Sequence, residues 1–229
     1  MLTLAIDTAA NFCSACLHDS ETGGMLAAEE RDIGRGHAEQ LIDVVGTVLQ
    51  SSGKSFDDIA KIAVAVGPGS FTGIRVGVAA ARGFGLALGV PVAGVTTLEA
   101  LHHDVRAMEA KGAVTVAVRG GRGQVFMQSF GAGGEAVSQA AAVDEDGAMR
   151  AVPEDVELLA GNAAAEIAAQ MSRPVQAVLA RATGSIGAIA ILGARSDRQP
   201  VPLYLRGADA KPQHGFALPR AGEQSRTRA

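Results

Sequence analysis

The chain has 229 residues, of which 48% are apolar and 19% are charged, a composition typical of a folded protein rather than of a disordered segment. Its formal net charge of −4 argues against a protein that binds nucleic acid unaided, because phosphate contacts need clustered lysine and arginine. Aromatic residues make up only 3%, without tryptophan, which argues against a surface that stacks bases. Nucleic acid held mainly by a partner subunit is compatible with these numbers.

Membrane and export signals are not evident in the sequence. No apolar stretch reaches the ~18 residues of a membrane helix without polar or charged interruptions. The N-terminus also lacks the basic region of a signal peptide. We therefore expect a cytoplasmic protein that makes no contact with a membrane.

In chain order, the first half predicts a meander of three strands followed by alternating helices and strands. Period-two alternation of apolar residues indicates strands, and a period near 3.6 indicates helices. The expected strands are 2–7, 12–18, 25–30, 62–66 and 91–95, and the expected helices are 37–51, 70–88 and 96–108. Ser55 with Asp58, and Thr96 with Glu99, have the form of capping turns. This order predicts a mixed sheet with a parallel centre and covering helices.

From Ala113 the pattern starts again. The expected strands are 114–118, 124–130, a third near 136–143 and 156–160, and the expected helices are 162–171 and 184–195. This restart predicts an α/β protein of two related halves, residues 1–110 and 111–206, although no internal sequence repeat is clear enough to align. Residues 207–229 show no periodicity, and we expect a mobile tail there.

The two cysteines, Cys13 and Cys16, have the Cys-x-x-Cys spacing of redox and metal sites. Their segment is expected to be a strand, in which residues three apart point to opposite faces and lie roughly 10 Å apart. A disulfide needs Cα atoms within about 7 Å of each other, and a zinc site would need a second cysteine pair. Buried, unreactive thiols are therefore the favoured interpretation.

Asp7 and Thr8 end the first strand, at the edge where ligands of mixed α/β sheets collect. A carboxylate there can hold Mg²⁺ through water, and Thr8 with nearby amides can face a phosphate, so both residues are candidates for weak nucleotide binding. The competing interpretation is an Asx turn, in which Asp7 accepts hydrogen bonds from its own downstream amides. The dipeptide alone favours the Asx turn.

Gly67–Gly73 is a glycine-rich turn that leads into a helix. Its spacing matches neither the dinucleotide-binding pattern nor the P-loop pattern, and it has no lysine. Gly69, Gly73, Gly77 and Ala81 recur every fourth residue, so they share one helix face. Because each glycine inside a helix costs about 0.5–1 kcal/mol relative to alanine, this face predicts a second backbone packed closely against it. The spacing does not say whether that backbone is internal or belongs to another chain.

A metal centre and a tightly bound cofactor are not expected. His37 opens a helix, but the position one turn later, where an H-x-x-x-H pair would need its second histidine, is Leu41. His102 and His103 are adjacent on a helix, so their side chains diverge by about 100°. Arg119 stands where the second phosphate loop of a duplicated fold would need an acid.

Five segments together closely resemble the TsaB (YeaZ) family. They are Ala5–Ala9, His37–Leu41, Gly67–Gly77, Gly94–Leu98 and Pro202–Arg206, and the G-P-G-S-F-T-G-I-R run within them is highly specific. The resemblance extends over nearly the whole chain before the tail. It implies an actin-like ATPase fold of the ribonuclease H-like kind, with two related halves that each contain a three-stranded meander in a mixed sheet.

The resemblance also implies a role in making threonylcarbamoyladenosine beside the anticodon of tRNAs that read codons beginning with A. In that family the chain is a noncatalytic subunit that binds and activates or stabilises TsaD, a paralogue with an H-x-x-x-H metal site. The ATPase TsaE joins the complex, tRNA is contacted through it, and a homodimer is the alternative assembly in isolation. The implied docking helices begin at 37 and near 70. Their expected partner-binding residues are His37, Leu41, Val45, Ser70, Phe71, Ile74 and Val78.

One departure from the family concerns the second half. Members usually carry an acidic D-A-R run before the second hairpin, whereas this chain has Arg119-Gly120-Gly121. The departure weakens the case for binding ATP. The competing hypothesis is an independent kinase or metallopeptidase. A kinase would need an acid on the second phosphate loop, and a metallopeptidase would need at least two metal ligands.

Overall fold

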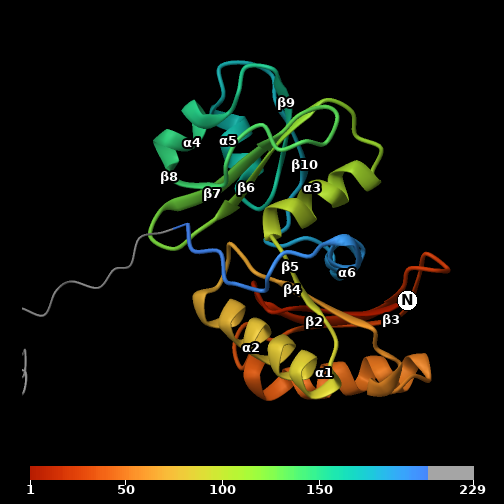
Figure 1. The fold of residues 1–229 in the computed structure, drawn as a ribbon. Coiled ribbons are helices and arrows are strands. Elements are labelled where there is room, and N and C mark those ends of the chain that lie inside the picture. Colours follow the sequence, from red (N-terminus) through yellow and green to blue (C-terminus); the bar gives the residue numbers. More distant parts are fainter. Residues whose placement is uncertain (206–229) are drawn as a thin grey trace, which may run out of the picture.

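The fold is that of a computed structural model, which describes residues 1–205; the expected tail lies outside them. Figure 1 shows two halves, each built around a five-stranded sheet. The first part of the chain forms β1 (Leu2–Asp7), β2 (Phe12–Asp19), β3 (Gly24–Asp32), α1 (His37–Ser52), the 3-10 helix η1 (Phe56–Asp58), β4 (Lys61–Ala65), α2 (Phe71–Leu88), β5 (Val92–Val95) and α3 (Thr97–Ala107). The second part forms β6 (Ala113–Arg119), β7 (Gln124–Phe130), β8 (Ala141–Asp144), α4 (Glu145–Ala151), β9 (Val156–Ala160), α5 (Ala164–Gln170), β10 (Gln176–Leu179) and α6 (Ile186–Arg195).

The two sheets have the same strand order and the same strand directions. The first sheet runs β3-β2-β1-β4-β5 and the second runs β8-β7-β6-β9-β10. In each sheet the central strand, β1 or β6, pairs antiparallel with the second strand of its meander, β2 or β7. It pairs parallel with the first strand after the meander, β4 or β9. The expectation of two related halves, each a mixed sheet with a three-stranded meander, is confirmed.

Local sequence signals account for much of the first half. Every residue of β4 is buried, as expected for a parallel strand that is covered on both faces. Both expected capping boxes are present: Ser55 N donates to Asp58 Oδ2 at 2.8 Å, and Thr96 N donates to Glu99 Oε2 at 3.1 Å. These caps fix where η1 and α3 begin.

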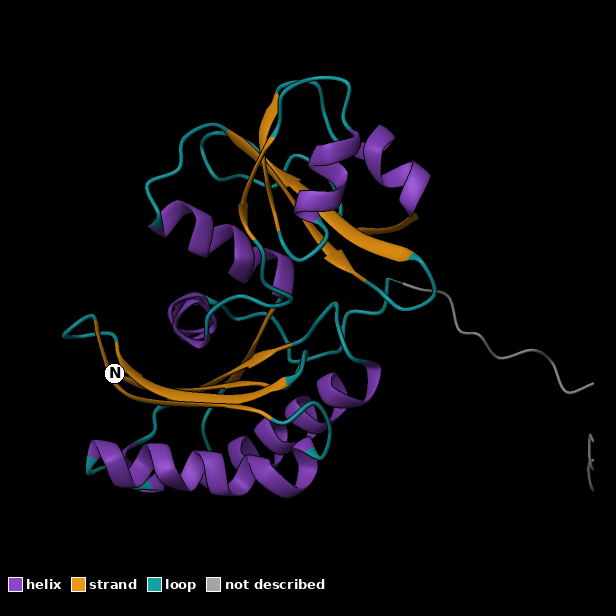
Figure 2. Ribbon diagram, turned by 180° about the vertical axis from the view of Figure 1, so that it is seen from behind, coloured by secondary structure: helices purple, strands orange, loops and turns teal. Residues whose placement is uncertain are grey.

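Helices cover both faces of the first sheet, and one of them comes from the far end of the chain. α1 and α2 lie on one face, and α6 lies on the other (Figure 2). Ile189 of α6 is completely buried in the core of the first half. Beyond α6, the Arg198 carbonyl accepts a hydrogen bond from β5, and Leu203 N donates to the end of β4. The expected second half, 111–206, is therefore corrected at its end, because residues 186–205 pack with the first half.

Short elements of the second half differ from the sequence prediction. The third strand is β8 alone, and Ala136 makes only an isolated bridge to Phe130. The sequence patterns do not reveal α4 and β10, which have seven and four residues. Segments of this length are too short for a helical or strand period to stand out.

α2 is the one helix within residues 1–205 that is long and apolar enough to cross a membrane. Its 18 residues lie along the first sheet. The side that faces the sheet is buried and contains Gly73, Ile74, Gly77, Val78, Ala81 and Gly85. Its apolar composition is explained in part by this packing, as in a core helix.

Candidate functional site

The glycine face of α2 packs against the protein's own β1–β2 turn. A Cβ at Gly69 would overlap the carbonyl oxygen of Ala9, and one at Gly73 would overlap that of Thr8. A Cβ at Gly77 would lie 2.5 Å from Thr8 Oγ1, which itself donates a 2.7 Å hydrogen bond to Gly73 O. The second backbone that the glycine spacing predicts is therefore internal, and this face of α2 is closed to a partner.

Most of the residues expected to contact a partner lie in the protein's own core. The exposed fractions are 8% for His37, 1% for Leu41, 0% for Val45, 2% for Ile74 and 4% for Val78. Their burial leaves little surface for a partner, because apolar residues at helical spacing mark the face that packs on the sheet. Partner contact through these five stays a prediction that the burial does not support. Ser70 and Phe71 are exposed, and their contact with a partner stays a prediction.

The opposite sides of α1 and α2 are open to solvent. We call this surface the outer face and define it by Ile42 and Gly46 of α1 and Ala79, Gly83 and Leu86 of α2, which are all exposed. Ile42 is 60% exposed and Leu86 is 87% exposed. A Cβ at Gly46 or Gly83 would meet nothing within 4 Å. Unlike the glycines of the inner face, these two have no close contact among residues 1–205 that would explain them.

The two helices of the outer face carry opposite charges. α1 contains Glu39 and Asp43 and no lysine or arginine, whereas α2 contains Arg75 and Arg82 and no acid. Asp43 is already paired, since Arg31 Nη1 donates to its carboxylate at 2.5 Å.

An exposed cluster of two aromatic rings and an arginine lies at the start of α2. The guanidinium carbon of Arg75 lies 3.6 Å from the centre of the Phe71 ring, and Arg75 Nε donates to Tyr204 Oη at 2.8 Å. A cation–π contact at an exposed site contributes about 0.5–1 kcal/mol. The cluster thus ties the segment after α6 to α2. Sequence reasoning misses Arg75 and Tyr204 as site residues, although the segments that carry the family resemblance contain both.

The carboxylate of Asp7 is used inside the protein. It accepts hydrogen bonds from Ala9 N at 2.7 Å and from Thr183 Oγ1 at 2.5 Å. The first bond confirms the Asx turn. Burial raises the pKa of Asp7, although both hydrogen bonds act in the opposite direction. Because Thr183 comes from the segment before α6, Asp7 joins the two ends of the chain.

A cleft lies between the two halves, beside the turn that follows β1. It has a volume of about 330 Å³ and is lined by Ala9, Asn11, Ser70, Gly120 and neighbouring residues, but not by Asp7 or Thr8. Nucleotide binding through those two residues therefore stays a prediction, without an accessible carboxylate to support it.

Arg119, also at this cleft, is held within the second half. Its side chain forms an ion pair with Glu166, and its amide donates to Asn162 Oδ1 at 2.7 Å. Arg119, which stands where the second phosphate loop would need an acid, thus makes its contacts within the second half.

Residues 1–205 contain no group of three or more histidine, cysteine or acidic side chains placed to hold a metal ion. Cys13 and Cys16 are free thiols and are completely buried. Burial raises their pKa values to about 11 and about 12, respectively. Such thiols carry almost no thiolate at neutral pH, and only the thiolate is a good nucleophile.

Comparison with known proteins links these features to a family. Residues 20–190 match the family model described as TsaD, tRNA N6-adenosine threonylcarbamoyltransferase. The chain is 33% identical over 130 residues to the tRNA threonylcarbamoyladenosine biosynthesis protein TsaB of Escherichia coli K12. YeaZ from Pseudomonas aeruginosa, a solved structure, is 25% identical with a TM-score of 0.74, covering 89% of this chain and 99% of that one. The chain belongs to the TsaB (YeaZ) family. This family acts in the biosynthesis of threonylcarbamoyladenosine in tRNA.

Coverage differs among the relatives of this TsaB-family chain. The alignment with E. coli TsaB spans 57% of this chain and 55% of that protein. An uncharacterized protein of Mycobacterium tuberculosis H37Rv is 34% identical over 215 residues, which is 91% of this chain and 93% of that protein. The ethanolamine utilization protein EutJ of Carboxydothermus hydrogenoformans has a TM-score of 0.56 at 12% identity, covering 84% of this chain and 90% of that one, and supports the fold alone.

Proposed function

We propose that the protein is a noncatalytic subunit that binds TsaD and activates or stabilises it. TsaD would transfer the threonylcarbamoyl group to the adenosine beside the anticodon of tRNAs that read codons beginning with A. TsaE would join this complex, and tRNA would be contacted through it. Membership of the TsaB family supports the proposal, as does the family model named for the transferase, which matches residues 20–190.

The residues at the start of α1 support a noncatalytic role, because they do not form a metal-binding pair. In TsaD, which the chain resembles, an H-x-x-x-H pair holds a metal. Here the ring of His37 lies against the protein's own turn, with Nε2 2.9 Å from Ala10 O. One helical turn later, Leu41 is 1% exposed in the core. A leucine offers no lone pair to a metal ion, so the pair cannot form at this position.

The open glycines of the outer face are the observation that carries the docking proposal. Each glycine inside a helix costs about 0.5–1 kcal/mol relative to alanine. Among residues 1–205, no neighbouring atom lies within 4 Å of a Cβ placed at Gly46 or Gly83, so no contact in this part of the chain offsets the cost. Helices from another subunit that cross at these positions would approach the backbone closely, because glycine has no side chain to keep them apart. Ile42 and Leu86 beside them would then bury their exposed apolar surface.

Two variants test the docking face without disturbing the core. Gly46→Arg and Gly83→Arg add side chains where the chain leaves open space, and both replace glycine with a better helix former. Ala169→Arg, on the exposed side of α5 in the second half, is the matched control. We expect both glycine variants to weaken TsaD binding at least about tenfold, as for disrupted interface centres. The control should bind TsaD as the unmodified chain does.

Reconstituted tRNA threonylcarbamoylation with TsaD and TsaE measures the function itself. Omission of this chain should abolish or strongly reduce modification. Full modification without the chain would refute the subunit role. Normal TsaD binding by both glycine variants would place the interface elsewhere.

Self-association is measured by size-exclusion chromatography with and without TsaD. Because one surface cannot serve two partners at once, a homodimer through the outer face should disappear as TsaD is added.

A further inference from the structure

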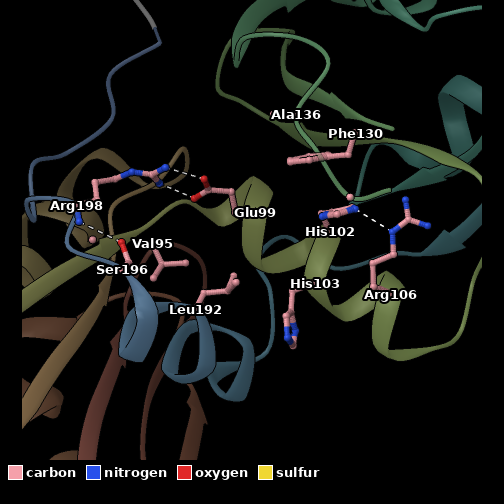
Figure 3. Close-up of a pocket in the computed structure, with 12 residues that line it drawn as sticks. Val95, Glu99, His102, His103, Arg106, Phe130, Ala136, Leu192, Ser196 and Arg198 are labelled. Carbon is pink, nitrogen blue, oxygen red and sulfur yellow. Dashed lines mark hydrogen bonds and ion pairs between the residues drawn. The ribbon is translucent and has the colours of Figure 1, made fainter. Parts of the chain in front are cut away.

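A second cavity, separate from the cleft at Arg119, lies against α3. Its volume is about 390 Å³, and it shares no lining residue with the cleft. As Figure 3 shows, side chains of α3 form its centre, α6 and the segment after it form one wall, and Phe130 with Ala136 of the second half form another. Both halves of the protein therefore contribute to the cavity.

The cavity contains an ion pair between Arg198 and Glu99, in which some N–H donors of the arginine lack a partner among residues 1–205 while most acceptor positions of the carboxylate are occupied. Arg198 donates from Nη1 to Glu99 Oε2 at 2.5 Å and from Nη2 to Glu99 Oε1 at 2.7 Å. Glu99 Oε2 also accepts from the amide and the hydroxyl of Thr96. A guanidinium has five N–H groups, so three of those on Arg198 have no acceptor among residues 1–205.

His102 adds a further donor. Its ring is stacked on Phe130 with centroids 4.1 Å apart and an interplanar angle of 5°. Its Nε2 accepts a 3.0 Å hydrogen bond from Arg106 Nε, and an arginine N–H always donates. Burial, with help from Arg106, lowers the pKa of His102 to about 4, so the ring is neutral at neutral pH and carries its proton on Nδ1. The described residues provide no acceptor for that proton.

The remaining walls are apolar, with Val95 and Leu192 on the side facing the first sheet and Ala136 near the Phe130 ring (Figure 3). Arg106, Arg198 and Glu99 together give the lining a formal charge of +1, since His102 is neutral. We propose that this cavity binds a small organic anion with a planar apolar group. Its carboxylate, or an equivalent acceptor group, lies toward Arg198 and His102 Nδ1, and its apolar group packs against Phe130 and Leu192. The site is independent of the subunit role proposed above.

Benzoate, with benzyl alcohol as its uncharged counterpart, tests the site. The readout is the Cε1–H resonance of His102 in the full chain, assigned with His102→Gln. We expect saturable shifts with benzoate and a dissociation constant of about 1 mM or tighter. Benzyl alcohol should bind at least about tenfold more weakly, because it has no carboxylate to accept charge-assisted hydrogen bonds from Arg198.

Two variants decide whether the response comes from the cavity. Ala136→Phe should fill the cavity and abolish the benzoate shift, while Val137→Phe, at an exposed neighbour that does not line the cavity, should leave it unchanged. Arg198→Gln should weaken benzoate and leave benzyl alcohol unaffected. Thermal unfolding establishes that each variant is folded. The proposal is overturned by the lack of a saturable benzoate shift, by equal binding of the two probes, or by a shift that persists in Ala136→Phe.

Discussion

Replacing Gly83 and Gly73 of α2 by alanine, one at a time, should change the stability of the protein in opposite directions. At Gly83 the new methyl group meets nothing within 4 Å, so only helix propensity changes, and the free energy of unfolding should rise by about 0.5–1 kcal/mol. At Gly73 the methyl group would overlap the carbonyl oxygen of Thr8. That turn is held in place, because Thr8 Oγ1 bonds Gly73 O and Ser70 N bonds Ala9 O, both at 2.7 Å.

The cost at Gly73 should therefore exceed its gain in helix propensity. Forcing an extra methyl group into a packed site costs about 1–3 kcal/mol, which leaves a net loss of up to about 2.5 kcal/mol for Gly73→Ala after the propensity gain of about 0.5–1 kcal/mol. Urea unfolding of both variants measures the difference from the shift in midpoint at constant slope. Dilute and concentrated samples are compared, since self-association through the outer face would add stability that depends on concentration. Equal effects of the two substitutions in dilute samples would refute the assignment of inner and outer faces.

Further predictions concern groups that the fold buries. Because the pKa of His102 is lowered to about 4, the unfolded chain binds a proton that the folded chain does not between about pH 6.5 and 4. Stability should therefore fall by about 1–3 kcal/mol as the pH drops through that window, and His102→Gln should flatten the fall. Asp7→Ala should cost about 1–3 kcal/mol in urea unfolding, because it leaves the Ala9 amide and the Thr183 hydroxyl without their acceptor. Combining it with Thr183→Val should cost less than the sum of the two. Tyr204→Ala should speed hydrogen exchange of the segment after α6 by loosening it from Arg75, whereas unchanged exchange would remove this role.

Sequence patterns were sufficient for the elements of the first half and for the kind of sheet, because those depend on local period and on capping residues. The alternation of the meander, the buried run of β4 and the capping box at Thr96 each act within a few residues. The return of α6 to the first sheet has no such signal. It depends on bonds between residues far apart in the chain, such as those from Ser185 N and Oγ to the Asp104 carboxylate, both 2.6 Å long. The same holds for the cavity at α3, which three distant segments build together.

The residues expected to contact a partner show a second limit of prediction from sequence. Leu41, Ile74 and their neighbours follow the helical period, and an apolar period identifies the face that a helix buries. In a protein that also docks through its helices, the strongest apolar stripe is used by its own core. The face left for a partner then shows only weak sequence signals: single exposed apolar residues and small residues without a stripe. Family resemblance selects a pair of helices to test, but it does not say which side of each helix is free.

Glycines inside the two helices separate these sides more clearly than apolar residues do. In α2, added Cβ atoms at Gly73, Gly77 and Gly85 would collide with Thr8 or Val92 of the same chain, whereas at Gly83, and at Gly46 of α1, they would meet open space. All five carry the same cost in helix propensity, so only the first three are explained by folding of the chain itself. The other two lie beside Ile42 and Leu86, which are likewise left exposed by the rest of residues 1–205. One side of this helix pair therefore carries two independent free-energy costs. One is the backbone entropy of the two glycines, and the other is the exposed apolar surface of Ile42 and Leu86. A second pair of helices packed on this side would bury the exposed apolar surface and would approach the two glycines closely.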